Sequence, residues 1–142
     1  MLKFKLVTLS GTKSSNDVHE VLLPTPQGQI AVFEHHSPLV SLATTGVIKV
    51  RKKAGDPDDF MDIYATNGGV IEIVNNTVKV LVDEADVPEE INQQEAEKAH
   101  QEAKNLLKDA KDQMSLDHAQ TMLDRTSVRL KVAELKNRRK RR

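Results

Sequence analysis

The chain has 142 residues, a formal net charge of zero and no cysteine. This length fits one domain, or one compact domain with an appendage. The lack of cysteine excludes a disulfide framework and any cysteine-ligated zinc or iron–sulfur site. No apolar run approaches the roughly 18 residues that a membrane-spanning helix needs. Because a strand pattern begins directly at Met1, the sequence predicts no leader or transit peptide, and any membrane association would come through a protein partner.

The neutral total hides an uneven distribution of charge. Residues 1–86 carry 8 Lys and Arg against 11 Asp and Glu, and residues 87–112 carry 4 against 7. Residues 113–142 carry 9 against 3. The pattern also changes from short β-rich segments to helical spacing near Asp86. We therefore predict a β-domain over 1–86 and a helical part over 87–142 that becomes strongly basic toward its end.

The first 86 residues alternate between apolar runs and turn residues. The apolar patterns predict eight short strands, at 2–9, 18–23, 30–33, 39–43, 47–51, 60–65, 70–74 and 77–82. Turns are predicted at 11–17, 24–28, Gly46, 54–59, 67–69 and 75–76. Many short strands at close spacing favour an α+β protein whose N-terminal part is a β-sandwich or flattened barrel. With three Phe, one Tyr and no Trp, its core must be aliphatic, which suits a base-stacking surface poorly.

The remaining residues show two amphipathic helical patterns. Asn92 and Glu95 resemble a capping box, although a start as early as Asp86 is possible because Pro88 suits a first turn. Either Asp112 or Ser115 can cap the second helix. The two apolar stripes are Ala96, Ala99, Ala103, Leu106 and Ala110, then Leu116, Ala119, Leu123, Thr126, Leu130 and Ala133. The short break between them predicts an antiparallel two-helix hairpin with a closely packed seam.

The predicted hairpin is only marginally stable alone, because an alanine seam buries little apolar area. A second apolar strip, formed by Val128, Val132 and Leu135, needs a further contact with the sandwich or with another protein. Packed and extended arrangements of such helices can lie within a few kcal/mol of each other.

The sequence shows no catalytic or metal-binding constellation. The adjacent His35 and His36 are expected to be loop or hairpin residues, because neighbouring residues on a strand point to opposite faces and rarely share an ion. The isolated His19, His100 and His118 are expected to be exposed. The acidic cluster around Asp58 lacks the spacing of a calcium loop and is expected to be a solvated turn. No nucleophile motif or phosphate-binding loop is present. The sequence therefore predicts a non-catalytic protein with no metal and no cofactor.

The basic end, residues 136–142, allows three interpretations. It can be a solvated helix terminus, where cations also suit the helix dipole. It can be a nucleic-acid tail on a β-sandwich binding module. It can also be an arm that seeks an acidic protein surface. The lack of aromatic residues among these cations counts against nucleic acid, and the composition alone does not decide further.

Several segments, in order, resemble the epsilon subunit of the F-type ATP synthase. They lie at residues 28–40, 46–50, 68–73, 76–85 and 129–135, so the resemblance covers nearly the whole chain. Ala31 stands where the family pattern usually has glycine. The resemblance implies an N-terminal sandwich that binds the gamma subunit and the ring of c subunits in the rotating stalk. It places Gly28, Gln29, His36 and Pro38 on the side that faces the ring.

The resemblance also implies a peripheral subunit on the cytoplasmic side of a bacterial plasma or inner membrane. In bacterial members the hairpin can extend along gamma into the catalytic head and block ATP hydrolysis. The residues that would then meet the alpha and beta subunits are Arg125, Arg129, Lys131, Lys136, Arg138 and Arg139.

Some bacterial members bind ATP in the folded hairpin, and this chain departs from their motif. Asn92 and Glu95 replace the aspartate and the arginine of the motif, and Glu102 replaces a further arginine of the first helix. Arg125 and Arg129 match the pair on the second helix. Because carboxylates repel a triphosphate, the sequence predicts only a remnant of that site and weak or absent ATP binding.

Overall fold

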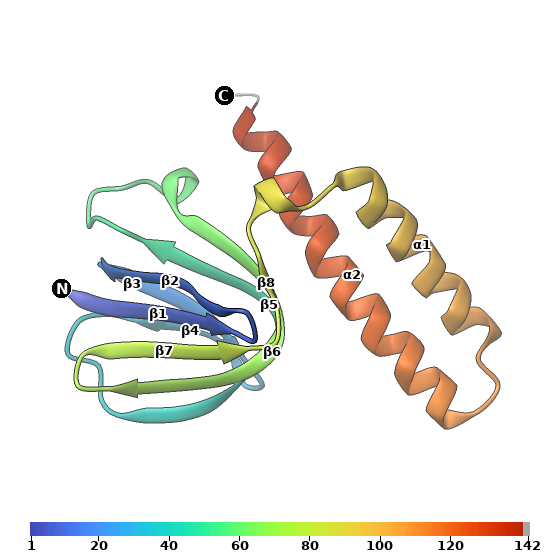
Figure 1. The fold of residues 1–142 in the computed structure, drawn as a ribbon, viewed down its shortest axis with the longest axis horizontal. Coiled ribbons are helices and arrows are strands. Elements are labelled where there is room, and N and C mark those ends of the chain that lie inside the picture. The colour runs from blue at the N-terminus through green and yellow to red at the C-terminus, as the bar shows by residue number, and fades with distance from the viewer. Residues whose placement is uncertain (141–142) are drawn as a thin grey trace. The chain divides into compact units, whose positions relative to one another are not determined.

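The computed structural model describes residues 1–140, and describes side chains as far as residue 135. It divides the chain into two compact units, Met1–Asp86 and the segment that starts at Val87. The first unit holds the strands and the second holds the two long helices (Figure 1).

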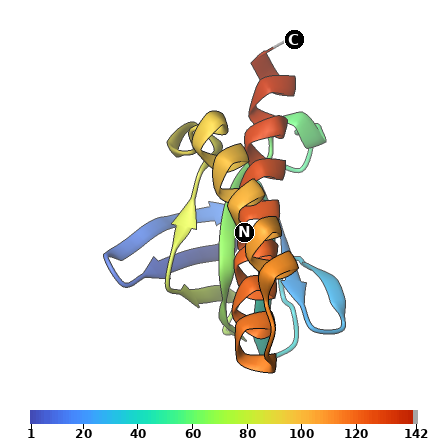
Figure 2. The same ribbon diagram turned by 90° about the vertical axis from the view of Figure 1, so that its right-hand side faces the viewer.

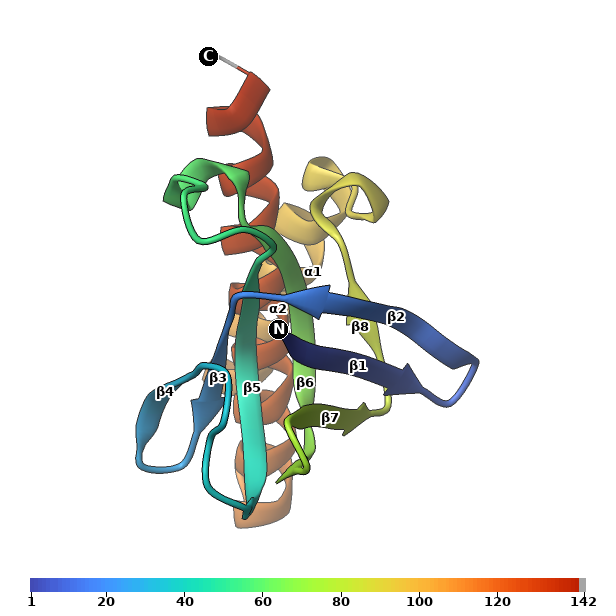
Figure 3. The ribbon, with the colours of Figure 1, turned by 90° about the vertical axis from the view of Figure 1, so that its left-hand side faces the viewer.

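Eight strands and one short helix form the first unit. They are β1 (Leu2–Thr8), β2 (Gly11–Val18), β3 (Glu20–Thr25), β4 (Gly28–Val32), β5 (Leu39–Arg51), the 3-10 turn η1 (Asp58–Phe60), β6 (Asp62–Val74), β7 (Thr77–Val82) and β8 (Ala85–Asp86). Hydrogen bonds connect them in the order β2-β1-β7-β6-β5-β3-β4, with β8 beside β6. Among the strands of residues 1–86, all of which the structure describes, only β1 and β7 pair in parallel. Figure 3 shows how the sheet folds over itself along the long strands β5 and β6.

The interior of this sandwich is mostly aliphatic, as its composition predicts. Fully buried side chains alternate along the strands, for example Leu2, Phe4 and Leu6 of β1. Of the aromatic residues, Phe4 and Tyr64 are buried, with ring centroids 6.2 Å apart. Because successive side chains point to opposite faces of a strand, this alternation shows that one face of each strand lies in the core.

The segment 11–17 was expected to be a turn and is strand β2. It pairs along β1, and the turn that joins the two strands lies between Thr8 and Gly11. The expectation was wrong because this strand is polar on both faces, and nearly all of its side chains are exposed. An edge strand needs no apolar face, so composition does not reveal it.

Gly46 and Asn67–Gly69 were expected to be turns and instead lie inside β5 and β6, each of which runs for 13 residues. A Cβ atom on Gly69 would lie 2.0 Å from the carbonyl oxygen of Leu81 in β7. One on Gly46 would lie 3.0 Å from the Cβ of Pro24 in β3. Gly69 therefore allows the backbone of β7 to approach closely, and Gly46 leaves room for the ring of Pro24.

Other local expectations for this unit agree with the structure. Asn75 and Asn76 form the turn between β6 and β7 with φ of 49° and 57°, a region that asparagine tolerates better than most residues. The strand 77–82 has the predicted bounds. Phe60, however, was placed in a strand and lies in η1 with its side chain exposed.

The second unit begins with the 3-10 turn η2 (Pro88–Glu90), followed by α1 (Gln93–Asp109) and α2 (Gln113–Lys140). The helices lie side by side and run in opposite directions (Figures 1 and 2). Asn92 caps α1, because its Oδ1 accepts the Glu95 N–H at 3.1 Å. Asp112 accepts the Ser115 N–H at 2.7 Å, which lowers the pKa of the Asp112 carboxyl. Of the two candidate caps, Asp112 is therefore the one used.

The seam between the helices is built mainly from alanine. Ala96, Ala103, Ala119 and Ala133 are at most 5% exposed. Leu106 and Leu116, which the stripes place in the seam, stay exposed instead. Both leucines lie in the helical turns next to the connecting loop. At this end of the hairpin no further turn of the partner helix covers them. The second strip is largely covered, since Val132 is fully buried and η2 packs against α2.

We expect Gly69→Ala to lower the free energy of unfolding of the sandwich by about 2–4 kcal/mol, because the added methyl group must push β6 and β7 apart. Urea unfolding followed by circular dichroism measures the change. Gly55→Ala is the matched control, since no atom lies within 4 Å of its added Cβ, and it should change stability by about 0.5 kcal/mol or less. Equal midpoints for the two variants would contradict this account of Gly69.

Candidate functional site

The sandwich residues singled out from the sequence lie at two ends of β4. Gly28 and Gln29 begin this strand and are exposed. His36 and Pro38 follow it in the connection to β5, with His36 half-buried and Pro38 exposed. The His36 ring Nδ1 lies 2.6 Å from the carbonyl oxygen of Ser37, so this nitrogen donates. The strand thus separates the two pairs, with one pair at its exposed start and the other in the loop that follows it.

The connection from β4 to β5 is held by the turn between β6 and β7. The His35 backbone N–H donates to Asn76 Oδ1 at 2.8 Å, and Asn76 Nδ2 donates to the Met1 carbonyl at 2.8 Å. The N-terminal ammonium donates to Glu34 at 2.9 Å and is the main cause that lowers the pKa of this carboxyl. Among the described residues no group of three potential ligands surrounds a metal position. The histidine pair therefore belongs to a structured loop.

A row of exposed apolar side chains crosses three strands of the sandwich. Leu42 of β5 is paired with Val70 of β6, which is paired with Leu81 of β7. Direct pairing places these three side chains on one face, where they are 63%, 39% and 40% exposed. Val40 extends the patch on β5 and is 74% exposed. We call Leu42, Val70 and Leu81 the apolar row.

The apolar row was not among the sites expected from the sequence. Its signal was present, because β5 and β7 place apolar residues at consecutive positions, as in Leu39-Val40 and Leu81-Val82. A strand with one solvated face should alternate instead. Consecutive apolar residues on a strand therefore indicate that its outer face also needs a partner.

The acidic turn around Asp58 is a structural ion-pair cluster. Arg51 Nε lies 2.9 Å from Glu20 Oε2, Arg51 NH2 lies 2.5 Å from Asp58 Oδ1, and the guanidinium also donates to the Asp56 carbonyl. Asp58 and Glu20 raise the pKa of Arg51, and Arg51 lowers the pKa of Asp58. The Arg51 side chain is only 15% exposed. The cluster joins β3, β5 and η1.

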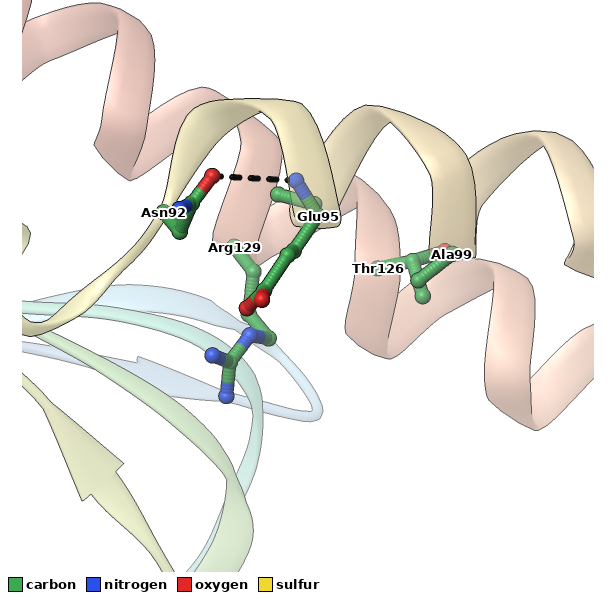
Figure 4. A pocket seen from close by; sticks show the side chains of 6 residues that line it. Asn92, Glu95, Ala99, Thr126 and Arg129 are labelled. Atoms are coloured by element: carbon green, nitrogen blue, oxygen red, sulfur yellow. Dashed lines mark hydrogen bonds between the residues drawn. The ribbon is translucent and has the colours of Figure 1, made fainter.

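The helical unit contains one pocket that includes residues of the motif segment. Its volume is about 190 Å³, and the residues that line it are Asn92, Glu95, Ala96, Ala99, Thr126 and Arg129. Figure 4 shows the carboxylate of Glu95 and the guanidinium of Arg129 close to one another at this pocket. The structure thus brings Asn92, Glu95 and Arg129 together. Glu102 and Arg125 are exposed and do not line it.

Two of the three histidines expected to be isolated have partners. The His100 ring lies between the helices, with its Nδ1 at 3.1 Å from Thr126 Oγ1. The His19 ring contacts the edge of the Phe33 ring at a centroid distance of 5.7 Å. His118 is exposed, as expected. Local sequence could not show these partners, because each lies on a different element.

The basic residues of the second helix follow the exposed side of α2 as far as side chains are described. Arg125 and Lys131 are exposed, and Arg129 is half-buried at the pocket. Lys136, Arg138 and Arg139 belong to the last turns of α2, and their side chains lie outside the described residues. Within the described part of the chain, no helix is long and apolar enough to cross a membrane.

A family model matches residues 1–87, and its description is the β-sandwich domain of the ATP synthase delta/epsilon chain. The chain belongs to this family. An ATP synthase epsilon chain of Staphylococcus haemolyticus is 34% identical to it over 132 residues, which cover 92% of this chain and 95% of the relative. The resemblance found in the sequence motifs is therefore confirmed over both the sandwich and the helices.

Two solved structures share the fold of this family member. A chain of the Euglena gracilis mitochondrial ATP synthase, in a structure of OSCP, F1 and c-ring, superimposes with a TM-score of 0.78 at 21% identity. This match covers 92% of this chain and 79% of the other. A chain of the Tetrahymena thermophila central stalk and c-ring gives a TM-score of 0.63 at 13% identity, covering 92% and 95%. The expected β-sandwich followed by two helices is confirmed.

Proposed function

We propose that this chain is the non-catalytic epsilon subunit of a rotary ATP synthase, located in the central stalk and coupling ion translocation to ATP synthesis. Its family and its similarity to epsilon chains along almost the whole length support this role. So does its likeness to a chain from a structure of the central stalk and c-ring. Such a subunit is peripheral to the membrane, on the cytoplasmic side in a bacterium, and reaches the membrane only through the complex.

The observation that carries this proposal is the apolar row on the sandwich. Three directly paired strands present Leu42, Val70 and Leu81 outward. An exposed contiguous apolar surface on a folded unit marks a site of protein contact. We assign the gamma subunit as the occupant of this face. Gly28 and Gln29 begin β4, and His36 and Pro38 lie in the loop that follows it. We assign both pairs to the c-subunit ring.

We expect Leu42→Glu to weaken binding of the full chain to the gamma subunit by about tenfold or more, because the carboxylate would be desolvated in the middle of an apolar contact. Titration of purified gamma with each variant measures the dissociation constant. Leu9→Glu is the control, since Leu9 is 85% exposed in the turn between β1 and β2 and lies outside the row. Equal, wild-type affinity for both variants would contradict the assignment of this face.

We further propose that the helical hairpin inhibits ATP hydrolysis when it extends toward the catalytic head. Residues 113–142 carry 9 Lys and Arg against 3 Asp and Glu. Of the described cations of α2, Arg125 and Lys131 are exposed. A basic helix of this kind complements acidic surfaces of the alpha and beta subunits. The seam of alanines supports the proposal, because little apolar area holds α2 against α1.

We propose that the folded hairpin does not need ATP. Glu95 places a carboxylate at the pocket beside the guanidinium of Arg129 (Figure 4). A carboxylate about 4 Å from a phosphate charge costs roughly 1–4 kcal/mol for effective dielectric constants between those of water and a protein surface. Arg125, the other cation of the pair, does not line the pocket. The pocket is therefore a poor site for a triphosphate.

Isothermal titration of the full chain with ATP should give weak or no binding. Glu95→Ala removes the repulsive carboxylate and should bind ATP more tightly than the natural chain does. Glu102→Ala is the matched control, since Glu102 does not line the pocket, and it should leave the titration unchanged. A micromolar dissociation constant for the natural chain would contradict this proposal.

A further inference from the structure

Small side chains are prominent in the seam between α1 and α2. Ala96, Ala103 and Ala119 are at most 5% exposed, and Leu107, Leu123 and Leu130 are half-buried. Alanines in a seam permit close approach of the two backbones. A directional contact between the helices would fix their register.

His100 and Thr126 make such a contact near the middle of both helices. Nδ1 of His100 lies 3.1 Å from Oγ1 of Thr126, and 3.4 Å from Oγ of Ser127. The Thr126 side chain is buried. The contact is therefore shielded from water on one side and joins residues that are 26 positions apart in the sequence.

The hydrogen atoms in this contact can be assigned from the neighbours of the threonine. Thr126 Oγ1 lies 2.9 Å from the Met122 carbonyl oxygen and 3.1 Å from that of Leu123. Carbonyl oxygens only accept, so the single hydroxyl hydrogen of Thr126 can point to its own helix. With the hydrogen in that position, the imidazole donates to Oγ1 and carries a hydrogen on Nδ1.

We propose that His100 and Thr126 form an interhelical latch, which fixes the register of the hairpin and must open before α1 and α2 separate. The latch is a property of the chain itself, and only its consequence for the enzyme rests on the proposed function. In the separated helices both groups return to water, so the net gain from the bond is modest. The latch biases the hairpin toward its packed arrangement and leaves it able to open.

Amide hydrogen exchange on the isolated full chain tests the latch. His100→Ala should raise the exchange rates of amides in the middle of α1 by about two- to tenfold, the range for one net hydrogen bond. Thr126→Val should do the same, since valine keeps the shape and loses the hydroxyl. In the double variant these exchange rates should be little higher than in either single variant, because the two substitutions remove the same interaction. Amides of β6 and β7 should be unchanged.

Two matched variants control for lost packing. His100→Asn places a side-chain N–H near the position of Nδ1 and should restore slow exchange. Ser127→Ala removes only the longer contact, and its amide exchange rates should stay close to those of the natural chain. Nitrogen NMR of the His100 ring should show the hydrogen on Nδ1.

Three outcomes would overturn the latch: unchanged exchange in His100→Ala, additive effects in the double variant, or equal acceleration in the sandwich. A bare Nδ1 would overturn the hydrogen assignment on which it stands. None of these outcomes bears on gamma binding by the apolar row, so a failed latch leaves the proposed function intact.

Discussion

The small apolar area between α1 and α2 is the constraint on which the behaviour of the helical unit depends. Alanine is among the best helix formers, so its use in the seam favours the helical state of both segments. Each buried methyl group removes little surface from water, at roughly 25 cal/mol per Å². The seam built from Ala96, Ala103, Ala119 and Ala133 therefore stabilises the helices more than it stabilises their association. An element built this way can be packed in one state and released in another.

The packing of the sandwich is the opposite of the packing between the helices. Its aliphatic core is fully buried, and Gly69 lets β7 approach β6 so closely that no side chain fits between them. The long strands β5 and β6 stay continuous through their bends, and this continuity aligns Leu42, Val70 and Leu81 across three strands. A rigid unit of this kind is suited to permanent docking, whereas the weak helical seam is suited to a change of state. The two proposed roles follow from these two kinds of packing.

Features set by a few neighbouring residues could be predicted from the sequence. The turn at Asn75 and Asn76 and the cap at Asn92 agree with the structure, because each depends on the backbone within three or four residues. Gly68 and Gly69 were misinterpreted because glycine serves both tight turns and close backbone approach. Only the position of β7, which is formed by later residues, distinguishes these uses.

The candidate sites also differ in whether the sequence could predict them. Asn92, Glu95 and Arg129 could be proposed from motif positions, and the structure brings them to one pocket. The apolar row and the contact of His100 with Thr126 could not, because they require the register of strands and helices that sequence spacing leaves open. The polar edge strand β2 could not be predicted from the sequence pattern, because it does not need an apolar face.

The central claim is that the weakly held basic hairpin is regulatory, while the sandwich alone provides docking. The most direct measurement is the rate of ATP hydrolysis by the assembled enzyme that carries residues 1–112 in place of the full chain. The account predicts faster hydrolysis, with the shortened chain still co-purifying with the gamma subunit. Unchanged hydrolysis with intact co-purification would contradict the regulatory role and leave only the docking role.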